Sequence, residues 1–189
     1  MRSWSRLRGW DRWRAAGLVA ACALATLWLR VPVESRVEAH FPHCTPTRLA
    51  HFLADFSNHR RLDPRLGIGS WRIEDEVSNY SSWEYGVSYE CGIRCTGRAR
   101  VSTHDELAPR EHRTRMHYAH CTPWSGILQR CEEAEVESVA KEAPGGGAVL
   151  QESARIWCGA LQLLSGACRV RRLRDVWLRA VAEALRAEG

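Results

Sequence analysis

The sequence predicts one α+β domain, built from an antiparallel sheet and a long C-terminal helix and preceded by an N-terminal hydrophobic segment. Three observations lead to this prediction. Segments with strand character follow one another between residues 71 and 158, with turn residues between them. An amphipathic helical pattern closes the chain. An uncharged apolar run lies between arginines near the N-terminus.

The length of 189 residues fits a single domain, because domains usually hold about 100 to 200 residues. We expect residues 1–30 to form a basic and hydrophobic targeting segment and residues 31–189 to form the domain. The sequence contains no low-complexity tract and no sign of a second domain.

The domain is expected to open with a strand and then a helix. β-branched residues nearly alternate over Val31–Ala39, which predicts the strand. Thr45 is a suitable helix cap with Pro46 at the first helical position, and apolar residues then recur at helical spacing to about Asn58. His59–Leu66 contains an Asp-Pro pair, which predicts a turn or a broken helix.

A succession of strands is expected next, and its clearest member alternates strictly. In that strand one face carries Trp83, Tyr85, Val87, Tyr89 and Cys91, and the other face is polar or small. Hairpin-length breaks between the strands imply an antiparallel sheet. The predicted strands are Trp71–Val77, Trp83–Cys91, Cys95–Leu107, His112–Cys121, Gly126–Val139 and Val149–Cys158.

The final stretch, about Leu164–Ala187, is expected to be one amphipathic helix. Its apolar stripe consists of Val170, Leu173, Trp177, Val181 and Leu185. The arginines fall largely off this stripe: Arg172, Arg174, Arg179 and Arg186.

The first thirty residues combine a charged region with an apolar one. Residues 2–14 carry five arginines and three tryptophans, and Ala15–Leu29 then runs without a charge. A signal peptide and an uncleaved membrane anchor both fit this pattern, and we favour the anchor. Arginines before the segment outnumber those just after it, which directs the domain to the lumen of the secretory pathway or the cell exterior. A mitochondrial presequence is the alternative, because the leader is rich in arginine and poor in acidic residues.

The charge distribution argues against nucleic-acid binding. The first thirty residues hold six arginines and one aspartate, which accounts for the whole formal net charge of +5. The remainder of the chain is close to neutral, whereas affinity for phosphate requires a basic surface on the folded domain.

Cysteine content and a sequon favour an oxidising compartment. Seven cysteines lie in the domain and Cys22 lies in the hydrophobic segment, a high load for a cytosolic protein. Cys91 and Cys95 flank a three-residue loop, so a disulfide between them is plausible. Asn79-Tyr80-Ser81 is a glycosylation sequon in a predicted turn.

This order of elements resembles the START-like or SRPBCC superfamily, which includes polyketide cyclase-like proteins and has the helix-grip fold. The resemblance covers residues 31–188, with local echoes in Leu49–Leu66 and in the closing helix with Trp177. It implies that the sheet curves around the C-terminal helix and leaves an apolar cavity, which members use for sterols, phospholipids, quinones, polyketides or plant hormones.

The residues expected to line such a cavity are inward-facing strand positions and the helix stripe, although each could equally pack a filled core. They are Trp83, Tyr85, Val87, Tyr89, Val101, Met116, Tyr118, Leu128, Val136, Ala154, Ile156, Trp177 and Val181.

Two clusters hold residue types that zinc accepts: His40, His43 and Cys44, and His117, His120 and Cys121. Their spacing matches no closed zinc motif, and on a strand His117 and His120 would face opposite sides, so we expect no metal site. The glutamates at 132, 133, 135 and 137 suggest a solvated face. No phosphate loop, nucleophile elbow or metalloprotease motif is present, so we expect no cofactor.

The leading hypothesis is a non-enzymatic protein that binds a lipid or another hydrophobic small molecule and is attached to a membrane by its N-terminal segment. This hypothesis depends on the resemblance. One alternative is a cyclase-like or aromatase-like enzyme in which Tyr118, His117 or Glu152 acts as acid or base. Another is a protein-interaction domain with a filled core.

Overall fold

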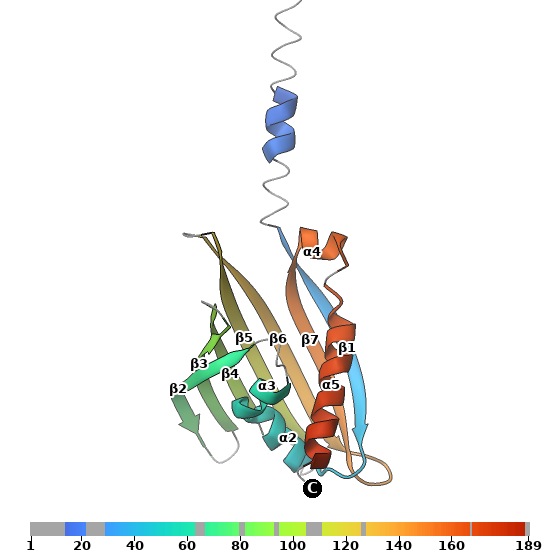
Figure 1. Cartoon of the computed structure of the whole chain (residues 1–189). Helices are drawn as coiled ribbons and strands as arrows, with labels where there is room; N and C mark the ends of the chain where they lie inside the picture. The colour runs from blue at the N-terminus through green and yellow to red at the C-terminus, as the bar shows by residue number, and fades with distance from the viewer. Residues whose placement is uncertain are drawn as a thin grey trace, which may run out of the picture. The chain divides into compact units, whose positions relative to one another are not determined.

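A computed structural model gives the structure of the chain (Figure 1) and describes residues 14–21, 29–62, 67–79, 82–92, 95–104, 111–125, 128–166 and 168–187. The chain forms two compact units. The smaller comprises Met1–Pro32 and Trp157–Cys168, and the larger comprises Val33–Ile156 and Arg169–Gly189. The larger unit holds most of the sheet and the long C-terminal helix.

The sheet has seven antiparallel strands in the order β1-β7-β6-β5-β4-β3-β2. Consecutive strands from β2 to β7 are neighbours, and β1 completes the sheet beside β7. The strands are β1 Arg30–Phe41, β2 Ile68–Ser78, β3 Ser82–Cys91, β4 Cys95–His104, β5 Glu111–Ser125, β6 Leu128–Glu142 and β7 Ala148–Gly159. The predicted strands are all found, with ends that differ by a few residues.

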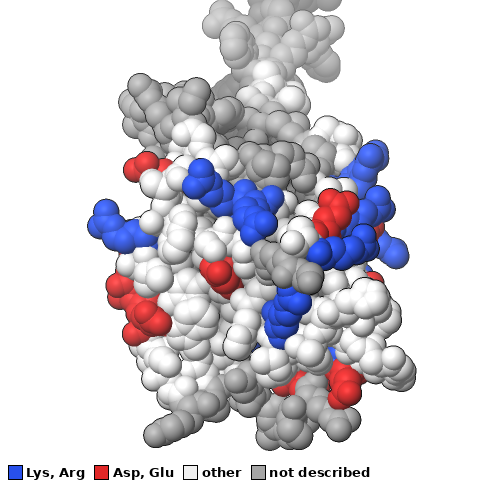
Figure 2. Space-filling view, turned by 60° about the horizontal axis from the view of Figure 1, so that its bottom comes forward, with Lys and Arg blue, Asp and Glu red and all other residues white. Residues whose placement is uncertain are grey.

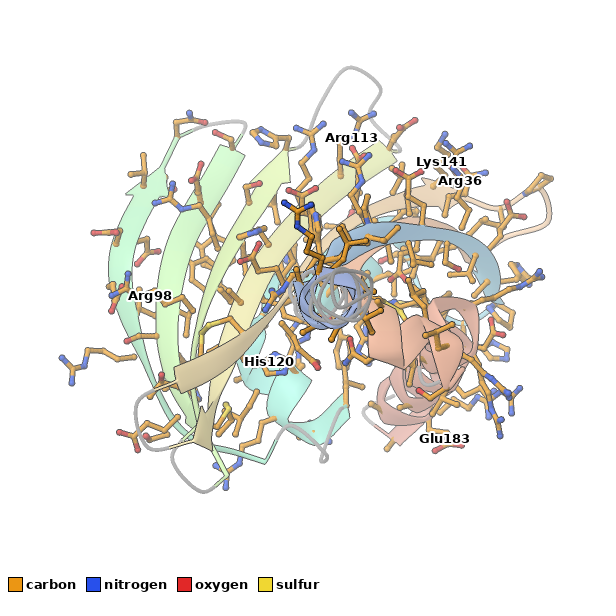
Figure 3. The ribbon with its side chains drawn as sticks, turned by 90° about the horizontal axis from the view of Figure 1, so that it is seen from above. Arg36, Arg98, Arg113, His120, Lys141 and Glu183 are labelled. Carbon is orange, nitrogen blue, oxygen red and sulfur yellow. A yellow bond between two sulfur atoms is a disulfide. The ribbon has the colours of Figure 1, made fainter. Side chains whose placement is uncertain are left out.

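The sheet is curved (Figure 3), and the buried residues of its strands are mainly apolar. Alternation places Tyr85, Val87 and Tyr89 of β3 in the core, while the residues between them are more exposed. Arg98 and Arg113 lie outside the curve, whereas His120 points to the inner side (Figure 3). The α+β prediction with a curved antiparallel sheet around a C-terminal helix is confirmed, and this is the helix-grip fold.

Two helices follow β1: α2 (Pro46–Ala54) and α3 (Phe56–Leu62). Thr45 caps α2 as predicted, since its side-chain oxygen accepts from the Arg48 N–H at 3.2 Å. The predicted single helix to Asn58 is wrong, because the chain leaves helical geometry at Asp55. The Tyr85 hydroxyl fills the break: it donates to the Ala54 carbonyl and accepts from the Phe56 N–H at 2.9 Å.

Removing that hydroxyl should therefore weaken the fold. Tyr85→Phe leaves a buried carbonyl and a buried N–H without a partner, so we expect the free energy of unfolding to fall by about 1–3 kcal/mol in urea unfolding experiments. Tyr89→Phe removes a hydroxyl from the same face of the same strand and serves as the control. Equal losses in the two variants would contradict the role given to Tyr85.

The C-terminal region contains two helices, α4 (Ala160–Leu164) and α5 (Val170–Ala187). The predicted start of one long helix at Leu164 is wrong, because a turn at Ser165 and Gly166 separates the two, with Gly166 at a φ of 66°. In α5 the buried stripe differs from the prediction at three positions, because Leu178 is also buried and the other two are Leu173 and Arg174. Leu173 is 38% exposed, whereas Arg174 is 8% exposed.

The core of the larger unit consists of two apolar clusters. In the first, α5 packs against α2 and against β6 and β7, through residues such as Leu178, Val181, Leu53 and Leu150. The second lies under the α2–α3 break and contains Phe56, Ile68 and the inward residues of β3 and β4. The two clusters cover different parts of the inner face of the sheet.

Residues 14–21 are helical and exposed. Most of the second half of the predicted apolar segment, residues 22–28, lies outside the described residues. Within the part of the chain that the structure describes, no helix is both long and apolar enough to cross a membrane.

Candidate functional site

A cavity lies in the larger unit between helices α3 and α5 and the inner face of the sheet. Its volume is about 60 Å³. Its lining is mainly apolar and aromatic, and it comes from α2, α3, β2, β3, β5, β6 and α5. The lining residues are Leu53, Phe56, His59, Ile68, Tyr89, Thr114, Met116, Tyr118, Val136, Ser138, Arg174 and Trp177.

Aromatic contacts hold the helices at the cavity. The ring of His59 stacks on Phe56 at 5.7 Å and on Trp177 at 6.1 Å, and so joins α3 to α5. Phe56 contacts Tyr89 of the sheet at 5.3 Å. The Arg174 guanidinium lies 4.1 Å from the centre of the Trp177 ring, a cation–π arrangement.

Tyr89 is fixed by a glycine on the neighbouring strand. A Cβ at Gly97 would overlap the Tyr89 ring, so only glycine lets the ring cross β4 at this point. Burial, with a further contribution from Tyr118, raises the pKa of Tyr89 above its ordinary value. The Tyr89 hydroxyl is therefore neutral at physiological pH.

One side of the cavity is polar. Arg174 of α5 donates to Glu152 of β7 through two nitrogens, each at 2.5 Å, and both side chains are nearly buried. Ser138 of β6 donates to the same carboxylate at 3.5 Å. Thr114 of β5 lies beside Ser138 in the sheet register.

Of the residues expected to line a cavity, five lie at this one: Tyr89, Met116, Tyr118, Val136 and Trp177. Tyr85, Val87 and Val101 instead belong to the cluster under the α2–α3 break, with Trp83 packed against it. Val181, one turn farther along α5, belongs to the first apolar cluster and does not line the cavity. Ala154 is buried and Ile156 is half-buried outside the lining, and the Leu128 side chain lies outside the described part of the chain.

The sequence did not indicate the other lining residues. The sequence pattern predicts a helix end at Phe56 and a turn at His59, whereas their place at the cavity depends on the break at Asp55. Thr114 and Ser138 are polar, so apolar patterning passed over them. Strand alternation does indicate the position of Thr114, because alternate residues share a face and Thr114 therefore lies on the same face as Met116 and Tyr118.

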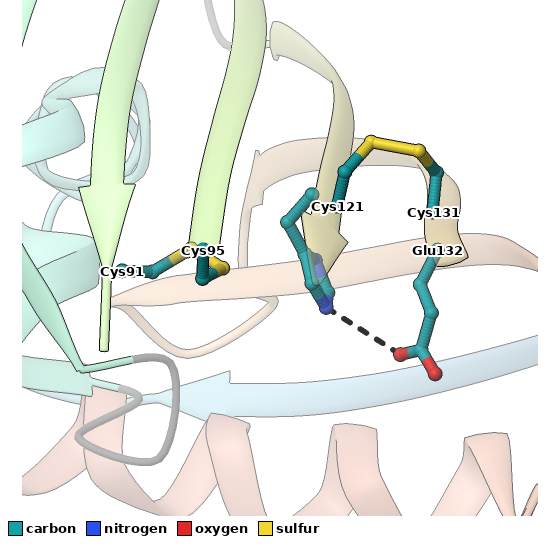
Figure 4. The surroundings of a disulfide bond; sticks show 6 residues. Cys91, Cys95, Cys121, Cys131 and Glu132 are labelled. Carbon is teal, nitrogen blue, oxygen red and sulfur yellow. Dashed lines mark ion pairs between the residues drawn. A yellow bond between two sulfur atoms is a disulfide. The ribbon is translucent and has the colours of Figure 1, made fainter. Parts of the chain in front are cut away.

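The two histidines of the second cluster lie on opposite faces of β5. His117 is exposed on the outer face, whereas His120 stacks on Tyr118 and lies 3.5 Å from Glu132 on the inner side (Figure 4). Cys121 is joined to Cys131 (Figure 4), so its sulfur is not available as a thiolate ligand. Among the described residues, no group of three or more ligand-type side chains gathers to hold a metal.

Only one of the three acid–base candidates lies at the cavity. Tyr118 lines it, His117 points to the outer face, and Glu152 is held by Arg174.

The outer face of the sheet is a mixed array of charges. Cross-strand pairs include Arg115 with Glu137 at 3.1 Å and Arg100 with Glu84 at 3.3 Å, all substantially exposed. Basic and acidic side chains are interspersed on the molecular face shown in Figure 2. Exposed pairs of this kind contribute about 0–1 kcal/mol each.

Three disulfides join cysteines of the described residues: Cys91–Cys95, Cys121–Cys131 and Cys158–Cys168. The first is the predicted one. Disulfides persist in oxidising compartments such as the secretory pathway and the cell exterior. Cys44 is buried in the core, and burial raises the pKa of its thiol.

No protein-family model matches the chain, and no curated protein matches it. Solved structures do. The hypothetical protein jhp0584 from Helicobacter pylori is 10% identical, with a TM-score of 0.50 over 82% of this chain and 87% of that one. The protein TTHA0849 from Thermus thermophilus is 14% identical, with a TM-score of 0.49 over 83% of this chain and 99% of that one. At these identities the similarity to the first protein shows a shared fold alone.

Proposed function

We propose that the chain binds a hydrophobic small molecule in the cavity between α3, α5 and the inner face of the sheet. The observation that carries this proposal is the lining. Apolar and aromatic side chains from sheet and helices face one space instead of interlocking across it, as they would in a filled core. The resemblance to the START-like superfamily supports the same ligand class.

The volume limits what the cavity accepts. About 60 Å³ is several times the roughly 10–15 Å³ that one water requires. It is well below the roughly 300–1,000 Å³ of sites for drug-sized ligands. The enclosed space therefore takes a short chain or part of a ring, and a whole ring or a longer ligand would extend past His59 and Tyr118, which are half-buried members of the lining.

Filling the cavity tests this function. Met116→Trp places an indole in the space, so we expect the purified full chain to lose an apolar molecule that native mass spectrometry and solvent extraction detect on the wild type. His117→Trp is the matched control, because the neighbouring side chain faces the outer side of the same strand. The amount of lipid bound by the N-terminal segment should be the same in both variants, so only lipid bound in the cavity can differ between them. Equal retention by the two variants would count against the cavity as the site.

We infer that the chain enters the secretory pathway and is attached to a membrane by its N-terminal segment. The apolar run Ala15–Leu29, its flanking arginines and the three disulfides support this inference. Exposed apolar side chains of the smaller unit, Leu18, Val19, Leu29 and Leu164, are of the kind that a membrane would cover.

Glycosylation tests the compartment. Asn79 is exposed in the turn between β2 and β3, so we expect a glycan there and a shift in gel mobility after glycosidase treatment. Asn79→Gln should abolish the shift, whereas Ser81→Thr keeps the sequon and should retain it. Recovery of unmodified chain in a mitochondrial fraction would contradict the inference.

A further inference from the structure

A row of polar residues crosses the inner face of the sheet beside the cavity. Thr114 of β5 pairs in register with Ser138 of β6, and Ser138 pairs with Glu152 of β7. The three residues are 4%, 6% and 3% exposed. Arg174 of α5 completes the row above Glu152.

Apolar residues border the β6 and β7 part of this row on both sides. The next inward register positions on one side are Met116, Val136 and Ala154, and those on β6 and β7 on the other side are Ala140 and Leu150. Within β6 and β7 the polar row is therefore a single layer between apolar residues, and on β5 the position beyond Thr114 is His112, which hydrogen-bonds to Thr47 at 2.9 Å. Polar groups in such surroundings require hydrogen-bond partners.

The residue at the β5 end of the row lacks a hydrogen-bond partner among the described residues. Glu152 accepts from both Arg174 and Ser138, but the Thr114 hydroxyl has no hydrogen-bond partner among the described residues although it is buried. Thr114 and Ser138 both line the cavity. A molecule in the cavity could therefore supply the bond that the protein does not.

We propose that Thr114, with Ser138 beside it, binds one uncharged polar group of the ligand, a hydroxyl or a carbonyl. This rests on the proposed function and specifies its ligand: an apolar molecule with a single hydrogen-bonding group that points toward β5 and β6. A carboxylate is disfavoured, because Glu152 already balances the charge of Arg174.

Three ring compounds of similar size test the proposal: benzene, phenol and benzoate, titrated into the full chain and followed by NMR. Phenol should bind the wild type about tenfold more tightly than benzene, as one buried hydrogen bond provides, and benzoate should bind more weakly than phenol. Thr114→Val removes the hydroxyl at nearly constant shape. This substitution should lower the affinity for phenol to nearly that for benzene, and it should leave the affinity for benzene unchanged.

Thr103→Val is the matched control. Thr103 lies opposite Thr114 on β4, but its hydroxyl already donates to the Trp83 carbonyl and it does not line the cavity. The phenol preference should survive this change. Equal binding of benzene and phenol by the wild type would mean that only water satisfies Thr114, and it would overturn the inference. A preference for phenol that persists in Thr114→Val would overturn it as well. Both results leave the proposed function standing. Failure of all three compounds to bind would overturn the proposed function as well.

Discussion

Replacing Glu152 by alanine is expected to lower the free energy of unfolding by about 3–5 kcal/mol. The substitution removes the carboxylate partner of Arg174, a residue that is 8% exposed and lies beside the Trp177 indole. The loss reflects the cost of an unpaired buried charge more than the strength of the ion pair itself. Denaturant unfolding monitored by circular dichroism measures it.

A matched control lies on the outer face of the sheet. Glu137 pairs with Arg115 across β5 and β6, but both side chains are largely exposed, so Glu137→Ala should cost about 0–1 kcal/mol. The double variant Glu152→Leu with Arg174→Met removes both charges and should recover stability close to the wild type. Equal losses in Glu152→Ala and Glu137→Ala would refute the argument.

The burial of Arg174 shows where sequence patterning stops. Helical spacing places residue 174 beside 170, 177 and 181 on the buried stripe, yet its charge favours the solvent side. The compensating signal lay far away in the sequence: Glu152 occupies an inward position of β7 between Leu150 and Ala154. Two opposite charges at inward positions of different elements predict a buried pair, but only when the packing of those elements is known.

The strands and the antiparallel pairing of consecutive strands from β2 to β7 were predictable because each strand carries a local signal, whereas the place of β1 beside β7 carries none. Strict alternation fixed the inward face of β3, and short breaks fixed the antiparallel pairing. The cavity was not predictable in the same way, since it depends on the break at Asp55 that places Phe56 and His59 over the sheet. No proline or glycine marks that break, and the hydroxyl that bridges it comes from Tyr85, on a strand that follows much later in the chain.

Trp177→Ala is the second large effect, expected to lower the free energy of unfolding by about 3–5 kcal/mol. Trp177 is 9% exposed, stacks on His59 and lies under Arg174, so truncation removes contacts that join α5 to α3 and to the polar row. It also opens a space continuous with the existing cavity, which Trp177 lines.

Added indole should therefore rescue this variant. A ligand that binds only the folded state stabilises it by about 2.7 kcal/mol at one hundred times its Kd, so the melting temperature of Trp177→Ala should rise with indole concentration. Leu178→Ala is the control, because Leu178 is equally buried on α5 but packs in the first cluster and not at the cavity. The free energy of unfolding of Leu178→Ala should fall by about 2–5 kcal/mol, and its melting temperature should rise little when indole is added. Rescue of both variants, or of neither, would show that the space beside Trp177 is not a binding site for a ring.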